Sequence, residues 1–307
     1  MTETTEATRP GSTRIGPTTF RWGERTYVMG ILNITPDSFS GDGLLGVDGG
    51  SGERTGSGGP GDPLEAAVAA GRRMVEEGAD ILDVGGESTR PGHEPVGAQE
   101  ERRRVVPVIA ALRAALPDTP LSIDTTKPAV AEAALAAGAD LINDVWGVGE
   151  DETLVRLAAD HCVPLIVMHN RAAPRYTTFL PEVIADLQRA LERAARLGVR
   201  WDDLIVDPGF GFGKTSEHNL ELLRELPALR MLGRPILLGT SRKSTLGRIL
   251  DLPATDRLEA TIATTALGIA GGADLVRVHD VRANVRAARI SDAVVRANWQ
   301  PDVTQGA

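Results

Sequence analysis

The sequence predicts an α/β fold, a (β/α)8 TIM barrel with an N-terminal β-hairpin. Eight short apolar runs have the length and β-branching of buried strands, and each is followed by a helical pattern. Apolar strands separated by helices pair in parallel, and eight such units favour a closed barrel. A doubly wound open sheet is the alternative. It would carry a Gly-rich dinucleotide turn after the first strand, where this chain has Asn33-Ile34-Thr35-Pro36.

The expected strands and helices alternate along the chain. We expect strands at residues 28–32, 81–84, 121–124, 141–144, 165–169, 204–207, 236–239 and 275–279. We expect helices at about residues 63–77, 98–116, 128–137, 152–160, 181–197, 219–226, 255–268 and 282–298. Asp62 is the expected N-cap of the first helix, and Gly78 its expected stop.

The segments outside this repeat are polar or rich in glycine. Residues 1–16 are rich in Thr, Glu and Gly, so a disordered tail is expected there. Residues 18–27 are typical of a hairpin that turns at Gly23. One domain is expected over residues 17–300, and within it the Gly- and Ser-rich residues 41–61 are expected to form a flexible insert.

The composition argues against nucleic-acid and membrane partners. The formal net charge is −9, which opposes binding to a polyanion. No apolar run reaches the length of a membrane span, and the polar N-terminus is unlike a signal peptide. The single cysteine, Cys162, begins an apolar run and is expected to be a buried structural thiol. A lone cysteine forms no intrachain disulfide, which fits a reducing cytoplasm.

Lysine is rare and its positions are suggestive. Of 33 basic residues only Lys127, Lys214 and Lys243 are lysines, and each follows a candidate strand. Chance is one explanation. The other is that some of these places require a compact, flexible ammonium group rather than a planar guanidinium group.

The segment LIVDPGFGFGK, residues 204–214, combines a buried strand, a carboxylate and a Gly-rich loop. It is not a phosphate-binding P-loop, because Pro208 stands where the first glycine of that motif belongs. Asp207 is therefore expected in the floor of a substrate pocket, with the mobile glycine loop at its edge. Apolar side chains in such loops, at Phe39, Phe210 and Phe212, are expected to cover a planar ligand.

Polar residues at the strand ends form the candidate site, because the C-terminal strand ends of a barrel make up its active face. The residues delivered there are Asn33, the Thr89–Arg90 loop, Asp124, Asn143, His169, Asp207, Lys243, Arg277 and His279. Asp124, Asn143 and Asp207 offer acceptors to a flat heterocycle with several N–H donors. Arg277 and His279, near the Asn33 loop, suit an anion, with or without a metal.

Simpler explanations exist for single members of this ring. Asp124 or Asp144 alone could cap a following helix, but a full ring of polar strand ends is harder to explain in that way. His169 could equally be a satisfied core histidine. The chain shows neither the Ser-His-Asp order of a hydrolase nor the Cys/His spacing of a zinc site.

Seven segments together resemble the dihydropteroate synthase family of pterin-binding enzymes, in family order over about residues 20–298. The segments are residues 29–40 (MGILNITPDSFS), 85–92 (GGESTRPG), 122–125 (SIDT), 142–144 (IND), 207–214 (DPGFGFGK), 241–244 (SRKS) and 277–279 (RVH). Two parts depart from that resemblance or have no role in it. The 41–61 insert is unusual for the family, and residues 170–174 match no functional part.

The resemblance implies a reaction between two small-molecule substrates. The amine of 4-aminobenzoate would attack 6-hydroxymethyl-7,8-dihydropterin diphosphate, giving 7,8-dihydropteroate and diphosphate. The residues implied to hold the pterin are Asp124, Asn143, Asp207 and Lys243. Arg277 and His279 would hold the diphosphate, with Mg²⁺ bound through Asn33.

The resemblance also implies an aminobenzoate site and an assembly. The residues implied for that site are Thr89, Arg90, Asp37, Ser38 and Phe39 on two loops, with Phe212, Ser244 and Arg242 around them. The residues implied to be catalytic are Asp124, Asp207, Lys243, Asp37 and Arg90. A cytoplasmic homodimer without nucleic-acid or membrane partners is what the family implies.

Two other functions share part of this pattern. A pterin-binding methyltransferase barrel would use the same Asp/Asn/Asp pocket, but it has no need of the Ser-Thr-Arg-Pro-Gly loop or the Ser-Arg-Lys-Ser turn. A non-catalytic pterin-binding paralogue is expected to have lost at least one of Asn33, Arg90, Lys243, Arg277 and His279, and all five are present.

Overall fold

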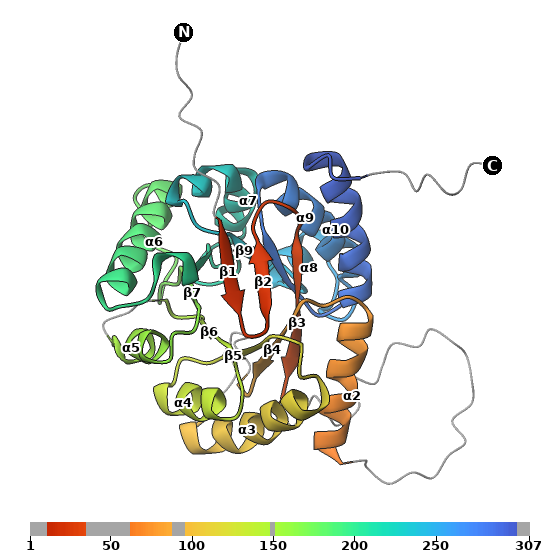
Figure 1. The fold of residues 1–307 in the computed structure, drawn as a ribbon. Coiled ribbons are helices and arrows are strands. Elements are labelled where there is room, and N and C mark those ends of the chain that lie inside the picture. The colour runs from red at the N-terminus through yellow and green to blue at the C-terminus, as the bar shows by residue number, and fades with distance from the viewer. Residues whose placement is uncertain (1–10, 35–61, 88–95, 148–150, 300–307) are drawn as a thin grey trace, which may run out of the picture.

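In a computed structural model, the chain forms a barrel of parallel strands inside a ring of helices (Figure 1). The structure describes residues 11–34, 62–87, 96–147 and 151–299. The strands pair in the order β8-β7-β6-β5-β4-β3-β10-β9, and every pair is parallel. A parallel bridge between Val206 and Ile236 joins the two ends of this order and closes the ring. The predicted TIM barrel is confirmed.

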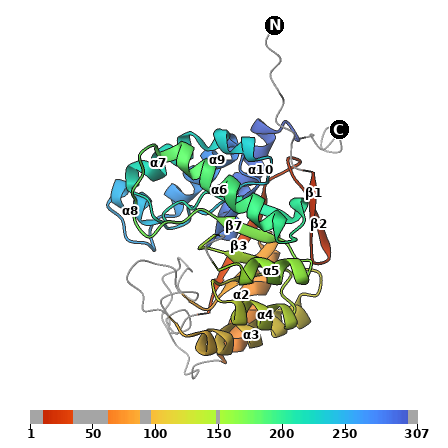
Figure 2. The same cartoon turned by 90° about the vertical axis from the view of Figure 1, so that its left-hand side faces the viewer.

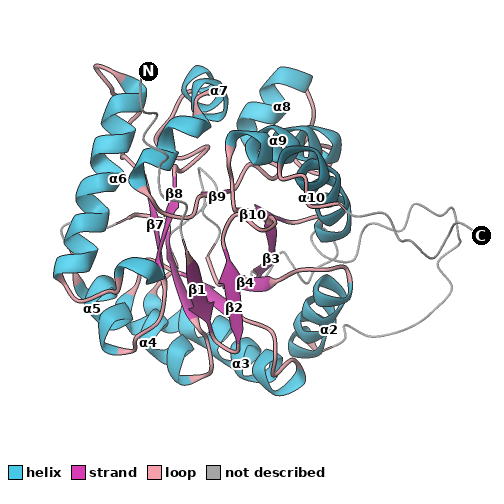
Figure 3. Cartoon of the chain, turned by 45° about the horizontal axis from the view of Figure 1, so that its top comes forward, coloured by secondary structure: helices cyan, strands magenta, loops and turns pink. Residues whose placement is uncertain are grey.

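Helices and strands alternate along the chain (Figure 3). The barrel strands are β3 (Tyr27–Asn33), β4 (Ile81–Gly85), β5 (Leu121–Asp124), β6 (Leu141–Asp144), β7 (Leu165–Met168), β8 (Leu204–Asp207), β9 (Leu237–Leu238) and β10 (Leu275–Val278). The α-helices are α2 (Pro63–Glu76), α3 (Ala98–Ala115), α4 (Pro128–Ala136), α5 (Thr153–Asp160), α6 (Phe179–Arg196), α7 (Ser216–Arg224), α8 (Ser244–Leu250), α9 (Leu258–Gly271) and α10 (Val281–Val295). Two short 3-10 helices are η1 (Trp201–Asp203) and η2 (Leu226–Leu232).

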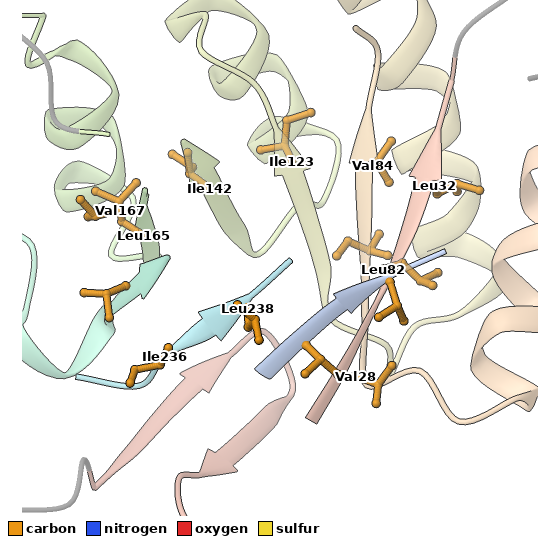
Figure 4. Packing of buried hydrophobic residues seen from close by; sticks show 14 of the residues in the cluster. Val28, Leu32, Leu82, Val84, Ile123, Ile142, Leu165, Val167, Ile236 and Leu238 are labelled. Atoms are coloured by element: carbon orange, nitrogen blue, oxygen red, sulfur yellow. The ribbon is translucent and has the colours of Figure 1, made fainter. Parts of the chain in front are cut away.

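The side-chain period of two in each strand divides the core into two clusters. Outward-facing residues such as Val84, Ile123 and Ile142 pack beneath the helices (Figure 4). Inward-facing residues form a second apolar cluster in the lower half of the barrel, to which the strands contribute Met29, Ile81, Leu141, Ile166, Ile205, Leu237 and Leu275. The other half of the barrel, at the C-terminal ends of the strands, is therefore left for polar side chains.

A hairpin covers the N-terminal end of the barrel, but it starts earlier than predicted. It pairs β1 (Ser12–Ile15) with β2 (Thr18–Arg21) and turns at Gly16, which has a φ of +55°. The predicted turn at Gly23 is wrong, because Tyr27 belongs to β3. The expected tail is also too long, since residues 12–15 form a strand, while residues 1–10 lie outside the described residues. Figure 2 shows this hairpin and α8 on opposite sides of the barrel.

Several local expectations have clear outcomes. The Asp62 side chain accepts a hydrogen bond from the Leu64 amide at the start of α2, and Gly78 follows that helix with a φ of +104°. Cys162 is exposed rather than buried, because it occupies a left-handed turn with a φ of +53° before the apolar run begins. The 41–61 insert lies outside the described residues. None of the described helices is long and apolar enough to cross a membrane.

Candidate functional site

Polar residues fill the C-terminal half of the barrel because the alternation of side chains along each strand points them inward. Asp83 and Gly85 lie on the same face of β4, and the register pairs Asp83 with Ser122 and Gly85 with Asp124. Asp124 in turn pairs with Asn143 on β6. The inward-facing polar residues of the strands are Asn33, Asp83, Ser122, Asp124, Asn143, Asp207 and Arg277. A single end of the barrel therefore collects three carboxylates and one guanidinium group.

Arg277 links two of these carboxylates. Its Nε donates to Asp83 Oδ2 at 2.6 Å, and an Nη donates to Asp124 Oδ2 at 2.5 Å. The Asn143 amide also donates to Asp83 Oδ2, at 3.1 Å. Arg277 thus contacts Asp124, one of the carboxylates expected for the heterocycle, although the sequence suggested only an anion as its partner. Among the described residues, two of its five N–H donors serve Asp83 and Asp124, which leaves three for a ligand.

Asp83 is a site residue that the sequence analysis missed. Its side chain is fully buried and holds both Arg277 and Asn143 in place. Its other oxygen, Oδ1, and the Ser122 hydroxyl have no hydrogen-bond partner among the described residues. The signal was a charged residue in the middle of the apolar run Ile81-Leu82-Asp83-Val84, two positions before a strand end. A carboxylate there faces the barrel interior and needs a cationic partner.

Burial raises the pKa values of two of the inward-facing carboxyl groups. Burial raises the pKa of Asp124 to about 7, with Arg277 and Lys243 opposing the shift and Asp83 adding to it. Burial also raises the pKa of Asp207, against the Gly209 amide, Lys243, Lys214 and Arg277. Oδ1 of Asp207 accepts that amide at 2.7 Å. Both carboxylates are therefore poised to pair with a ligand that brings N–H donors or positive charge.

The Gly-rich loop after β8 packs closely against the chain that follows β7. Gly209 and Gly213 have φ values of +70° and +53°, and a Cβ at either would lie 1.9 Å from the His169 carbonyl oxygen or 2.3 Å from that of Arg171. Glycine is required there by backbone conformation and close approach. Phe210 is buried in the core between strands and helices, so the prediction that it covers a ligand is wrong.

Lys243 and Phe212 meet in the loops that follow β9 and β8. The Lys243 Nζ lies 3.8 Å from the centroid of the Phe212 ring, a cation–π contact. The Lys243 stem also runs along the glycine loop, where a Cβ at Gly211 would be 3.0 Å from its Cδ. Phe212 stays half-buried at this place, as a residue that lines a ligand site would. Ser244 follows as the first residue of α8 and is exposed.

His279 is held by a serine on the neighbouring loop. The Ser241 hydroxyl accepts the His279 backbone amide at 3.2 Å and lies 2.9 Å from its Nδ1. A hydroxyl that accepts from the amide can donate to Nδ1, which leaves the proton on Nε2. The next residue, Arg242, pairs with Asp280 through two N–H groups at 2.7 and 3.2 Å. Arg242, which was expected beside the aminobenzoate site, thus forms an ion pair with Asp280.

Asn33 ends β3 beside the carboxylates, and the position of a Gly85 Cβ would lie 3.8 Å from its Oδ1. No group of three or more His, Cys, Asp or Glu side chains that could enclose a metal occurs in the described part of the chain. Mg²⁺ takes oxygen ligands, keeps several waters and commonly binds substrate phosphates, so one amide oxygen can complete such a set. The residues present fit a metal that arrives with a diphosphate.

Several expected site residues belong to segments that the structure does not describe. These are Asp37, Ser38, Phe39, Thr89 and Arg90. His169 lies at the end of β7 and is buried, with Lys214 Nζ at 2.9 Å from Nδ1 and Asp186 Oδ2 at 3.2 Å from Nε2. Of the two alternatives for His169, a ligand-binding residue or a core histidine with its hydrogen bonds satisfied, the structure favours the second. Arg171, from the segment without a role, pairs with Glu182 and Asp186 on α6.

Comparisons with known proteins agree with this geometry. Residues 51–279 match a family model described as "Pterin binding enzyme". The chain is 48% identical to a dihydropteroate synthase of Clostridium beijerinckii, over 92% of this chain and 99% of that one. A dihydropteroate synthase structure from Clostridium difficile, determined in the presence of pteroic acid, is 47% identical with a TM-score of 0.81 and covers 90% of this chain and 99% of that chain. A Xanthomonas albilineans dihydropteroate synthase structure with 4-aminobenzoic acid is 42% identical with a TM-score of 0.83 and covers 94% and 98%.

Proposed function

The chain belongs to the dihydropteroate synthase family of transferases, and we propose how its side chains divide the work of that reaction. The reaction joins 6-hydroxymethyl-7,8-dihydropterin diphosphate to 4-aminobenzoate and releases 7,8-dihydropteroate and diphosphate. The observation that carries the proposal is the cage of Asp83, Asp124, Asn143, Asp207 and Arg277 at one end of a closed barrel. Its acceptors complement the N–H edge of a pterin ring.

The pterin is held by Asp124, Asn143, Asp207 and Lys243. Loss of diphosphate leaves a developing positive charge on the pterin methylene. Carboxylates already fixed beside the ring stabilise that charge without reorganising at the moment of reaction. The aniline nitrogen is a weak nucleophile, so its attack depends on placement against the methylene.

The departing diphosphate meets Arg277 and His279. Among the described residues two of the five N–H donors of Arg277 serve carboxylates, and His279 carries its proton on Nε2 when Ser241 donates to Nδ1, so both side chains can donate to an anion. Mg²⁺ held by Asn33 would supply further neutralisation of the diphosphate charge when bound.

The aminobenzoate half is assigned to Phe212 and Ser244, with Arg242 beside them. Asp37, Ser38, Phe39, Thr89 and Arg90 are proposed to complete it. Water must be kept from the developing cation, and loops that close over the substrates would achieve this. Asp37 and Arg90 are proposed as catalytic on this ground.

The experiment that tests this function is a coupled assay for diphosphate release. Release is expected only when both the pterin diphosphate and 4-aminobenzoate are present, and Asp124→Ala should abolish it. Pterin binding without release would instead indicate a non-catalytic paralogue. Methyl transfer to or from a bound pterin without diphosphate release would indicate the methyltransferase class.

We also propose that two copies of the chain associate through α9 and α10. These helices lie side by side (Figure 2). They expose Leu267, Ile290 and Val294, and the spacing of i and i+4 places Ile290 and Val294 on one face of α10. Ile290→Glu with Val294→Glu is expected to convert a dimer into a monomer in sedimentation experiments. A wild-type monomer would contradict this assembly.

The exposed thiol of Cys162 is most compatible with a reducing cytoplasm.

A further inference from the structure

Lys214 ends the Gly-rich loop, yet its side chain turns back beneath that loop. Its Nζ lies 2.9 Å from His169 Nδ1, 3.0 Å from the Phe212 carbonyl oxygen and 3.3 Å from the His169 carbonyl oxygen. An ammonium group has three N–H donors and no acceptor. The three neighbours are all acceptors when His169 carries its proton on Nε2. The ammonium of Lys214 thus joins the end of β7 to the middle of the loop.

The histidine that receives this ammonium is itself fixed from the other side. His169 Nε2 faces Asp186 Oδ2 on α6 at 3.2 Å, and Arg171 donates to the same oxygen at 2.7 Å. Burial lowers the pKa of His169 to about 4, and the charge of Lys214 contributes to this shift. The imidazole is therefore neutral near pH 7, and Nδ1 remains an acceptor for Lys214.

The loop has little freedom to form these contacts in another way. A Cβ on Gly209 would lie 3.2 Å from Lys214 Nζ as well as inside the His169 backbone. The Tyr176 hydroxyl donates to the Gly213 carbonyl oxygen at 2.8 Å, and the Gly211 amide donates to Asn219 at 2.7 Å. Contacts on both sides of Phe212 thus hold the backbone that aims its ring at Lys243.

We propose that Lys214 is a positioning residue for the aminobenzoate half of the reaction, acting through the Phe212 carbonyl that its ammonium holds. This inference rests on the proposed assignment of Phe212 to the aminobenzoate site. The pterin-side groups depend on it less. Asp124 and Asn143 are fixed by Arg277 and Asp83 on other strands. Asp207 accepts the amide of Gly209 in this loop, but as the last residue of β8 it is also held by the barrel.

The charges around Lys214 predict a pH dependence for this tie. Burial lowers its pKa to about 7, against Asp207 and Asp186, while Arg171 and Lys243 lower it further. Loss of the proton leaves an amine with two N–H donors facing three acceptors, so one contact is lost. The KM for 4-aminobenzoate is therefore expected to rise as the pH increases through about 7, and this rise should depend on Lys214.

The test compares Lys214→Met with the wild type and with Arg248→Met. Arg248 is a matched control because it is a cation on α8 that donates to Ser216 on α7, outside the loop. For Lys214→Met we expect the KM for 4-aminobenzoate to rise by about tenfold or more, while direct pterin binding without 4-aminobenzoate changes by less than about threefold. Arg248→Met should change neither quantity. Equal losses for both substrates, or no loss, would overturn the proposal.

A second variant keeps the test decisive if Lys214→Met is poorly folded. Tyr176→Phe removes one other hydrogen bond to the loop, at Gly213, and keeps the ring, which makes edge-to-face contacts with Phe179 and His218. A smaller rise in the aminobenzoate KM, again without a loss of pterin binding, is expected. Failure of the wild type to release diphosphate would refute the proposed function, whereas normal wild-type turnover without this split in both variants would refute only the role of Lys214.

Discussion

Replacing Lys243 with arginine keeps the charge but changes its shape. The Lys243 stem fits against Gly211 and its ammonium sits over the Phe212 ring, so a wider guanidinium must displace a substrate or leave the pocket. We expect kcat/KM to fall at least 100-fold, which corresponds to about 2.7 kcal/mol of transition-state stabilisation, with an unchanged melting temperature. Arg103→Lys on the exposed face of α3 is the control and should be silent. Turnover near that of the wild type in Lys243→Arg would argue against a contact role for the ammonium.

Asp83→Asn is expected to move the acid limb of the pH profile. In the proposed mechanism Asp124 acts as a carboxylate, and its pKa is about 7, so kcat/KM should rise as the pH increases through that value. The charge of Asp83 raises the pKa of Asp124 and also occupies Arg277. Without that charge the pKa of Asp124 falls, and the acid limb should shift to lower pH, although the maximal rate drops.

The control for this shift is Asp144→Asn. Burial also raises the pKa of Asp144 to about 7, but its side chain points away from the barrel interior and accepts the Trp146 amide. Removing that carboxylate should leave the acid limb in place. An unmoved limb in Asp83→Asn would mean that Asp124 does not set it.

At the scale of elements, the Gly-rich loop shows where sequence reasoning succeeds and fails. The period of each strand and the polar residue at its end predicted the barrel and the inward placement of Asp124, Asn143 and Asp207. A run of glycines predicts mobility, but glycines also permit close backbone contact, and the sequence alone does not distinguish the two. The pairs Arg277–Asp83 and Lys214–His169 join residues 194 and 45 positions apart, so only the register of the barrel reveals them.

Gly209→Ala tests whether this loop is built for contact. The new methyl group would lie 1.9 Å from the His169 carbonyl oxygen, and the backbone would also be strained at a φ of +70°. Gly233→Ala is the matched control, since Gly233 has a φ of +63° and nothing within 4 Å of a Cβ. Strain alone should cost Gly233→Ala about 1 to 3 kcal/mol of unfolding free energy.

Gly209→Ala is expected to lose more than its control, because the backbone clash adds to the strain. Chemical denaturation of the two variants measures the difference directly. Equal losses would show that the loop can move away from His169, and would restore the view that its glycines provide mobility.

Across the whole molecule, the two ends of the barrel serve different purposes. The N-terminal end is apolar and closed by the hairpin, where the Phe20 ring lies 4.6 Å from that of Tyr27 and 5.7 Å from that of Trp22. The C-terminal end buries carboxylates whose raised pKa values show that their charge is costly to hold. The two ends of the barrel thus differ in what they bury, aromatic rings at one end and carboxylates at the other, and the active face of such a barrel is its C-terminal end.

Phe20→Ala should lower stability and preserve activity, whereas Asp207→Asn should raise stability at pH 8 and lower activity. Phe20 is fully buried, and its truncation is expected to cost about 3 to 5 kcal/mol of unfolding free energy. That loss corresponds to a fall of roughly 10 °C in melting temperature for a chain of this size. Well below that temperature, kcat/KM should stay within about twofold of the wild type, because the hairpin lies at the far end from the site.

In Asp207→Asn the amide oxygen can still accept the Gly209 amide, while the buried charge is gone. Burial raises the pKa of Asp207 in the folded protein above its value in the unfolded chain. Between these two pKa values the folded protein keeps the carboxyl proton, whereas the unfolded chain has released it. The carboxylate therefore opposes folding above the pKa of the unfolded chain, and its removal should raise the melting temperature at pH 8 but not at pH 4. Activity is expected to fall at least 100-fold, because the pterin and the developing cation lose a carboxylate. A variant that is both less stable and fully active would show that Asp207 supports the barrel rather than the reaction.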